Sequence, residues 1–412
     1  MQEEKRLVPQ LRFSEFEGEW EKKTLFDISK QVAYGMNAAA KSYDGENKYL
    51  RITDIDESTR RFIPNPLSSP KGKIEKKYIL KKGDIVFTRT GASVGKSYLY
   101  DEKDGKLLYA GFLIKFNIIN SNPYFVFLQT FRESYRKWVQ VYSMRSGQPG
   151  LNAEEYKSLI INIPQSKEQQ KIANFLTAID NRIQTLEKKK SGLEQYKKGV
   201  MQKIFKQELR FKDDTSTTLS ASDGKAFPEW EEKKLGDFLS LPKKETPEFI
   251  DIAKILTVKL NLKGVFLNNR TDGLKIGATK YIIRKKGQFI YGKQNLFNGA
   301  FAIIPDKFDG FVSSGDVPSL DIESNQLDSK FLYFFLARTS FYKKLENIAS
   351  GSGSKRIHEK TLFKVEIGLP SLKEQTKIAN FLSTVDKNIA LVSKKIEHTK
   401  TYKKGLMQQM FV

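Results

Sequence analysis

The chain has 412 residues, of which 71 are Lys or Arg and 48 are Asp or Glu, so its formal net charge is +23. This length predicts two or three domains, and the basic excess favours nucleic acid as a partner over a merely solvated basic surface or an attraction to anionic lipid. The absence of cysteine excludes disulfides, thiolate zinc sites and cysteine nucleophiles, and the two histidines, His358 and His398, do not have a metal-binding spacing.

The N-terminal segment is charged and has no apolar stretch typical of a signal peptide. Nowhere does the chain contain about 18 consecutive apolar residues, the length that spans a bilayer. We therefore expect a soluble, cytoplasmic protein with no membrane partner.

Residues 1–163 are expected to form a mixed α/β (α+β) domain. The pattern of residues 78–87 indicates a strand, a turn at Lys82-Gly83 and a second strand, and a short amphipathic helix is predicted near residues 123–139. Asn122-Pro123-Tyr124 lacks one proline of the adenine-methyltransferase tetrapeptide, so we interpret it as the start of this helix.

The segment 90–97 is one residue too short between its glycines to be a nucleotide-binding phosphate loop. Its neighbour Arg89, together with Ser93 and Lys96, is better suited to contacting a DNA backbone. No Ser-His-Asp set or convincing carboxylate cluster accompanies it. The sequence therefore predicts a chain without catalysis of its own.

Residues 164–211 are predicted to form a long helix. Its apolar residues recur every three, four or seven positions, as in a coiled-coil seam interrupted by Lys190. The seam residues are Ile172, Phe175, Ile179, Ile183 and Leu186. Gly199 near the helix end indicates either a kink or a site of close packing, and both interpretations remain open.

A polar linker is predicted at residues 212–224, followed by a second mixed α/β domain over residues 225–369. This domain has a strand pattern at 281–291 and a helical one at 328–346. Trp230 and the residues after it repeat the segment that begins at Trp20, which indicates that the two domains are copies with similar folds.

Residues 370–412 repeat the long helix. Residues 370–411 align with residues 164–205 without a gap, at 21 of 42 identical positions. The second seam consists of Ile378, Phe381, Val385, Ile389 and Val392, and it is interrupted by Thr399. Because the helices are copies separated by a domain, we expect them to pair as an antiparallel coiled coil with a pseudo-two-fold axis.

Some polar positions of the helix are also identical in its copy: Lys171, Asn174 and Asp180 return as Lys377, Asn380 and Asp386. This repetition suggests two equivalent docking surfaces for two copies of a partner.

Between roughly residues 30–140 and 240–345 the two α/β domains share almost no obvious identity, so we call these segments the variable blocks. Glycine-rich loops at residues 144–150 and 350–356 follow them at equivalent positions. Such loops let the backbone approach a ligand closely, and their Arg, Lys and Gln side chains are those that contact bases and phosphates. The alternative is that both are merely mobile surface loops.

With these features together, the sequence resembles a type I restriction–modification specificity subunit. The resemblance rests on Pro164, Lys167-Glu168-Gln169, the segment 171–176 (KIANFL) and Asp180, and on their copies between Pro370 and Asp386. It covers almost the entire chain.

The resemblance implies two target recognition domains, each reading one half of an asymmetric, bipartite site in double-stranded DNA. The helix pair would set the spacer between the half-sites and dock two methyltransferase subunits. Two restriction subunits would join the full complex. S-adenosylmethionine, ATP and Mg would then be bound by the partner subunits, with no cofactor or metal on this chain.

The variable blocks offer no motif that would transfer contact residues, so candidates for DNA contact follow from loop chemistry alone. They are Tyr34, Lys41, Arg51, Arg89, Ser93, Lys96, Arg145, Gln148, Lys293, Gln294, Lys355 and Arg356.

Two other kinds of protein are weighed against this one. A methyltransferase fused to its own reader would need cofactor motifs that we do not find. A coiled-coil scaffold with an incidental basic surface, bound to RNA or a membrane, would show no preference among DNA sequences.

Overall fold

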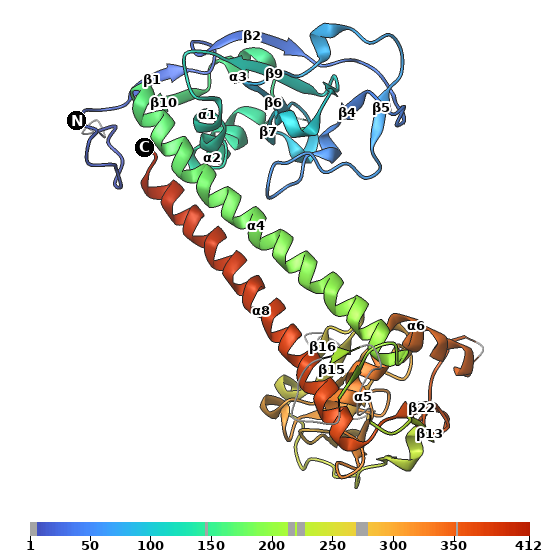
Figure 1. Cartoon of the computed structure of the whole chain (residues 1–412). Coiled ribbons are helices and arrows are strands. Elements are labelled where there is room, and N and C mark those ends of the chain that lie inside the picture. Colours follow the sequence, from blue (N-terminus) through green and yellow to red (C-terminus); the bar gives the residue numbers. More distant parts are fainter. Residues whose placement is uncertain (1–5, 145–146, 213–218, 221–226, 269–278, 352) are drawn as a thin grey trace. The chain divides into compact units, whose positions relative to one another are not determined.

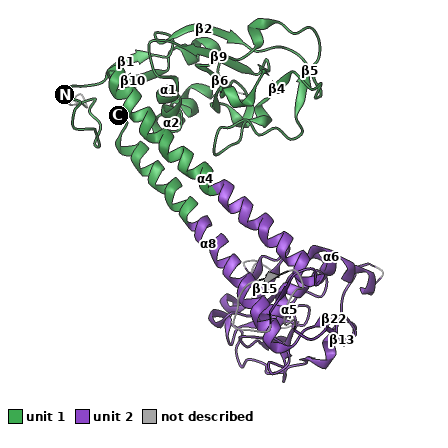
Figure 2. Cartoon of the chain, viewed as in Figure 1, with its two compact units in different colours: residues 1–186, 395–412 green, residues 187–394 purple. Residues whose placement is uncertain are grey.

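The computed structural model describes residues 6–144, 147–212, 219–220, 227–268, 279–351 and 353–412. The chain divides into two compact units, residues 1–186 with 395–412 (unit 1) and residues 187–394 (unit 2). Two long helices, α4 (Ser166–Phe205) and α8 (Leu372–Gln409), each contribute one part to unit 1 and the other part to unit 2 (Figure 1, Figure 2).

Unit 1 is built on a four-stranded antiparallel sheet of order β2-β9-β6-β7. Its core is formed by side chains of this sheet and of the short helices behind it, among them Phe87, Phe116 and Tyr156. The elements of unit 1 before α4 are β1 (Glu21–Thr24), β2 (Ser29–Tyr34), β3 (Ala40–Ser42), β4 (Lys48–Leu50), β5 (Ser68–Pro70), β6 (Asp84–Thr88), β7 (Ser97–Leu99), β8 (Leu107–Tyr109), β9 (Leu113–Ile118), α1 (Pro123–Gln129), α2 (Glu133–Ser143), α3 (Ala153–Lys157) and β10 (Ile160–Ile163).

Unit 2 repeats this design with the sheet β14-β21-β18-β19, whose strands occupy the positions of β2, β9, β6 and β7. The two units therefore have similar folds, as predicted. The elements between α4 and α8 are β11 (Arg210–Phe211), β12 (Leu219–Ser220), β13 (Glu231–Lys234), β14 (Leu239–Ser240), β15 (Leu256–Lys259), β16 (Gly264–Leu267), β17 (Tyr281–Ile283), β18 (Phe289–Tyr291), β19 (Phe301–Ile303), β20 (Val312–Ser314), β21 (Ser319–Ile322), α5 (Ser329–Leu336), α6 (Thr339–Tyr342), α7 (Glu359–Leu362) and β22 (Glu366–Leu369).

We call β6 in unit 1 and β18 in unit 2 the central strands. The turn before the central strand is also duplicated, and both copies contain a buried polar residue. Asp84 accepts the backbone N–H of Lys81 at 2.8 Å and the side-chain amide of Asn117 at 2.7 Å. Gln288 accepts the backbone N–H of Lys285 and donates to Asp321 at 2.7 Å. The weak similarity between Lys82-Gly83 and Lys286-Gly287 in the sequence thus marks a shared structural feature.

The long helices run antiparallel to each other within each unit, which confirms the predicted pairing. In unit 1 the Lys403 ammonium donates to the Asp180 carboxylate at 2.7 Å, and in unit 2 Lys197 pairs with Asp386 at the same distance. Asp180 and Asp386 thus have partners within the helix pair, so their repetition has a structural explanation.

The predicted seam residues lie on the inner faces of these helices. In unit 1, Ile172 and Ile183 are buried and Phe175, Ile179 and Leu186 are partly buried. In unit 2, the buried residues are Ile378, Val385 and Val392, and the partly buried ones are Phe381 and Ile389.

A triplet of sequence Leu-Arg-Phe fastens each long helix to its unit. Arg12 makes two hydrogen bonds with the Glu168 carboxylate, at 2.8 and 2.7 Å, and Arg210 makes two with Glu374, at 3.1 and 2.8 Å. Both carboxylates are buried. Although the prediction extended the first helix to residue 211, α4 ends at Phe205, because Leu209 to Phe211 form this joint and strand β11.

The short helices are divided more finely than expected. The segment 123–139 forms α1 and α2, and 328–346 forms α5, α6 and a 3₁₀ turn at Lys343–Ile348. Asn122 caps α1, with its side-chain oxygen accepting the N–H of Phe125 at 3.0 Å and Pro123 in the first turn. This confirms that Asn122-Pro123-Tyr124 is a helix start.

Candidate nucleic-acid interface

A basic residue follows the central strand in each unit, held in the same backbone frame. Arg89 donates its N–H to the carbonyl of Phe112 at 3.1 Å, and its own carbonyl accepts from Leu151 at 2.8 Å. Lys293 has the same two bonds, to Asp316 and from Ile357, both at 2.9 Å. In each unit, one backbone hydrogen bond to the turn at Phe112 or Asp316 and one from Leu151 or Ile357 therefore hold a basic residue at the same position of the fold.

In unit 1, the structure brings Tyr34, Arg89 and Gln148 into one neighbourhood. The Arg89 guanidinium lies over the Tyr34 ring, 5.0 Å from its centroid. The Tyr34 hydroxyl accepts the backbone N–H of Ala153 at 3.1 Å, which holds the ring in place. The loop of Gln148 lies beside the turn after Arg89, since the N–H of Gly91 donates to the Pro149 carbonyl at 3.0 Å.

In unit 2, the structure brings together all four predicted residues. Lys293 pairs with Glu359 at 2.9 Å, and Lys355 pairs with Glu346 at 2.8 Å. The Gln294 amide lies against the guanidinium of Arg356, whose Nη2 donates to its carbonyl oxygen at 2.8 Å in the orientation that satisfies both groups. The set contains side chains of the types that can recognise base edges, and each is held by a neighbour.

The turn at Ser314–Val317 in unit 2 is held by a buried arginine. The Arg284 guanidinium donates to the carbonyls of Ser314 and Val317, both at 3.3 Å, and its Nε donates to the Ser313 hydroxyl at 2.7 Å. Burial lowers the pKa of Arg284 to about 10, so it still carries its charge at neutral pH. The turn presents Asp316, which lies 3.7 Å from Arg356.

Other predicted contact residues have internal partners. Lys96 is only 7% exposed, and its ammonium donates to the Ile55 carbonyl and pairs with Glu57. The Arg51 guanidinium is held by Asp54 at 2.7 Å, so it closes a local turn.

Two further candidates lie in a short turn and on an exposed strand. Ser93 belongs to a 3₁₀ turn, Gly91–Ser93, and its carbonyl accepts the N–H of Lys96. Lys41 lies on the exposed strand β3, 3.5 Å from Asp44. Arg145 and most of the predicted linker 212–224 lie outside the described residues.

Phe112, Asp316 and Glu359 also belong to these neighbourhoods, and the sequence did not single them out. Phe112 and Asp316 occupy equivalent positions but have opposite chemistry, so the repeat gave no signal for them. An aromatic residue directly after a glycine, between the apolar runs 107–110 and 113–118, was the only hint for Phe112.

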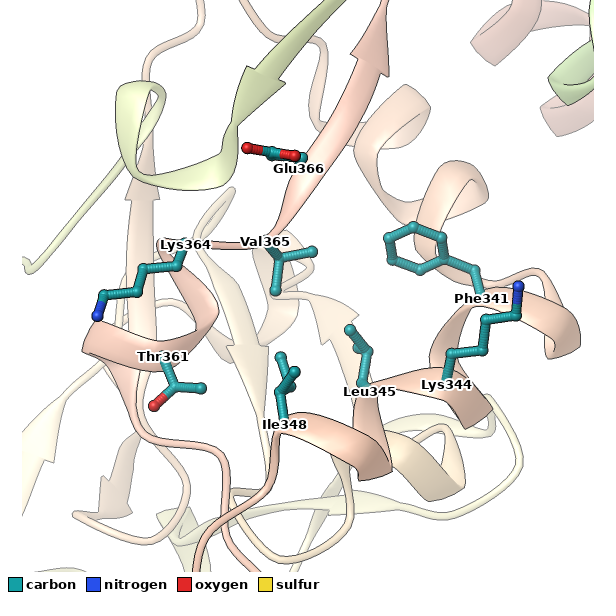
Figure 3. Close-up of a pocket in the computed structure, with 8 residues that line it drawn as sticks. All are labelled: Phe341, Lys344, Leu345, Ile348, Thr361, Lys364, Val365 and Glu366. Atoms are coloured by element: carbon teal, nitrogen blue, oxygen red, sulfur yellow. The ribbon is translucent and has the colours of Figure 1, made fainter.

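A separate hollow of about 330 Å³ lies in unit 2 (Figure 3). It is lined by Phe341, Lys344, Leu345, Ile348, Thr361, Lys364, Val365 and Glu366. None of the predicted contact residues is among them. At the position of Lys344, unit 1 has Trp138, whose ring stacks on Tyr142 at 4.9 Å.

Within the described ranges, no three His, Cys, Asp or Glu residues are grouped so that they could hold a metal ion. In the same part of the chain, no helix is both long and apolar enough to cross a membrane.

The chain matches the family model of the type I restriction modification DNA specificity domain twice, over residues 17–195 and 228–400. It is 24% identical to the type I restriction enzyme HindI specificity subunit of Haemophilus influenzae, over 86% of this chain and 90% of the relative. It is 23% identical to the type I restriction enzyme MjaVIII specificity subunit of Methanocaldococcus jannaschii, over 81% and 79%.

Among solved structures, the S subunit of a type I restriction–modification system from M. genitalium has a similar fold, with a TM-score of 0.60. The alignment covers 98% of this chain and 99% of that one, at 15% sequence identity. The fold is therefore shared over the whole length, and the family model matches once in each repeat. The chain belongs to the family of type I restriction–modification DNA specificity subunits.

Proposed function

We propose that each unit reads one half of a bipartite, asymmetric site in double-stranded DNA. The observation that carries the proposal is the frame found in both units, in which a basic residue, Arg89 or Lys293, is fixed at the end of the central strand. Because the two units share this backbone arrangement but surround it with different side chains, each unit is suited to a half-site of different sequence. The net charge of +23 supplies the phosphate attraction on which such base contacts depend.

The long helices would set the spacer between the half-sites and dock two methyltransferase subunits. Tyr196 and Tyr402 support the docking role, because they are identical in the two helices and are 51% and 58% exposed. An exposed aromatic residue retained in both copies is a suitable anchor for two copies of one partner.

As a specificity subunit, the chain is the non-catalytic component of a type I restriction enzyme. The methyltransferase subunits would contribute S-adenosylmethionine-dependent methylation of adenine N6. Two restriction subunits, with ATP and Mg, would join the full complex for cleavage.

The test is to map methylated adenines in DNA exposed to the complex of this chain with its cognate methyltransferase subunit. A split motif with two fixed halves and a constant gap is the expected result. Arg89→Ala should weaken binding of one half-site and Lys293→Ala that of the other, each by about tenfold, the loss expected for one base or phosphate contact.

Lys103→Ala is the matched control, because Lys103 is exposed and follows β7 at the opposite end of the sheet from Arg89. It should leave the motif unchanged. Scattered methylation by a complex whose assembly is confirmed would contradict site reading and favour the scaffold. Methylation by this chain without its partner would favour a fused methyltransferase.

A further inference from the structure

Phe112 is an exposed apolar side chain on a turn whose backbone is held firmly in place. The side chain is 61% exposed, although it lies between the buried strands β8 and β9. The turn is closed by the N–H of Leu113, which donates to the Ala110 carbonyl at 2.9 Å. The N–H of Arg89 binds the carbonyl of Phe112 itself.

The backbone of residues 35 and 36 secures the same turn from its other side. Gly35 donates to the Leu113 carbonyl at 3.0 Å, and the Met36 carbonyl accepts the N–H of Gly111 at 2.8 Å. The two segments approach so closely that a Cβ on Gly35 would lie 2.1 Å from the Ala110 carbonyl oxygen. Phe112 is therefore presented in a fixed position, which lowers the entropic cost of a contact with a ligand.

Unit 2 has the same turn with a different side chain at its tip. The N–H of Val317 donates to the Ser314 carbonyl at 3.0 Å, as Leu113 does to Ala110, and the N–H of Lys293 binds Asp316 as Arg89 binds Phe112. Arg284 supplies the additional support there. The backbone is repeated while the tip changes from phenylalanine to aspartate, as expected for a position that contacts different ligands in the two units.

The neighbours of Phe112 favour an anionic ligand, in keeping with the DNA of the proposed function. Arg89 lies over the Tyr34 ring, and no carboxylate among the described residues forms an ion pair with its guanidinium. Its charge therefore remains available for an anionic ligand, and a DNA strand held by Arg89 would bring its base edges to the adjacent tip. Among base-edge groups in the major groove, the one that an aromatic side chain contacts favourably is the 5-methyl group of thymine.

We propose that Phe112 is a specificity-determining residue of unit 1, which contacts the 5-methyl group of one thymine in its half-site. This inference rests on the proposed function. Asp316, at the equivalent tip in unit 2, would bind a base edge by hydrogen bonding, either directly or through Arg356.

The experiment uses the methyltransferase complex and duplexes that carry its mapped site, with each thymine of the two half-sites replaced singly by deoxyuridine. Rates of methyl transfer are measured for each duplex. With the natural chain, deoxyuridine at one position of one half-site should slow methylation roughly fourfold, the factor expected for one buried methyl group. Phe112→Ala should abolish this difference between thymine and deoxyuridine, and Phe112→Leu should keep most of it.

Two control variants separate the proposal from general effects. Phe26 is 54% exposed and lies at the opposite end of β2 from Tyr34, so Phe26→Ala should keep the thymine preference of the natural chain. Asp316→Ala should also keep this thymine preference, while the base preference changes at one position of the half-site read by unit 2.

A thymine preference that survives in Phe112→Ala would overturn the proposal, and so would a natural complex that treats thymine and deoxyuridine alike at every position. In either case, a split motif that is still methylated would leave the proposed function standing. Failure to find any split motif would instead count against the proposed function itself.

Discussion

At the scale of single residues, the repeated Lys-Glu-Gln triplet proves to be the joint between a long helix and its unit. Glu168 and Glu374 are buried and paired with Arg12 and Arg210. The neighbouring glutamine binds its unit as well: the Gln375 side chain donates to the Pro370 carbonyl and accepts the N–H of Asp328, both at 2.9 Å. The sequence identified the triplet, but its arginine partners lie more than 150 positions away, so no local pattern could reveal them.

Glu374→Ala is expected to destabilise unit 2 strongly. The substitution leaves the buried Arg210 guanidinium without its carboxylate, and breaking a buried pair in this way typically costs about 3–5 kcal/mol. Urea unfolding of the full chain measures the loss. Glu75→Ala is the matched control: its partner Lys77 is exposed, so the change should stay within about 1 kcal/mol. Equal effects of the two substitutions would show that the Arg210 pair has no structural importance.

The candidate contact residues show how little loop chemistry says about whether a side chain is accessible. Arg89, Gln148 and the four candidates of unit 2 lie where loops meet the ends of strands. Lys96 has the same chemistry, yet its ammonium is buried against Ile55 and Glu57. A basic residue in a polar loop has the same appearance in sequence whether it faces solvent or closes the fold. Only the pairing of distant segments distinguishes the two cases.

At the scale of elements, the long helices were predicted well because their signal is local and repeated. Apolar residues recur every three, four or seven positions along helices of 40 residues (α4) and 38 residues (α8). The strands of the recognition units are only two to six residues long, and their order depends on contacts between distant segments. The sequence could therefore predict mixed α/β units but not the sheet order β2-β9-β6-β7.

Neither Gly199 nor Gly405 interrupts its helix. Both helices continue without a break through these residues, and a Cβ on either glycine would meet nothing within 4 Å. Close packing inside the chain therefore does not require a glycine at either position.

Gly199→Ala and Gly405→Ala should each stabilise the chain by about 0.5–1 kcal/mol, because alanine loses less backbone freedom than glycine in a helix. Urea unfolding checks this. Gly35→Ala provides the contrast and should be strongly destabilising, since its Cβ would overlap the Ala110 carbonyl. A loss of stability in both helical variants would mean that the glycines support a bend in the helices.

At the scale of the whole molecule, the internal repeat allowed the architecture to be predicted. An offset of 206 residues relates Asp180 to Asp386 and Lys197 to Lys403, and these four residues form two ion pairs between the helices. Trp20 and Trp230 mark the same strand in the two units. The repeat of Leu11 to Phe13 at Leu209 to Phe211 falls outside the aligned helix segments, and three residues are too few to be recognised as a repeat by themselves.

The spacer role predicts how a longer helix pair would change the DNA site. A seven-residue insertion after Leu186, with a matched insertion after Val392, keeps the phase of both seams and lengthens the pair by about 10 Å. The gap in the methylated motif should then grow by about three base pairs, because successive base pairs are about 3.4 Å apart. Methylation mapping gives the result.

Inserting four residues between Leu186 and Leu193 in α4 alone should instead shift one seam against the other and abolish or alter recognition. An unchanged motif in both variants would show that the helices do not set the gap.

The hydrogen-bonded turn that carries Phe112 in unit 1 and Asp316 in unit 2 has an evolutionary consequence. Its support comes from backbone hydrogen bonds and from residues elsewhere in the unit, so the side chain at the tip contributes little to folding. A single codon change at this position can therefore be tolerated by the fold. If the tip contacts DNA as we propose, lineages that carry this protein would acquire a new DNA target by this one change, without first having to evolve a new scaffold.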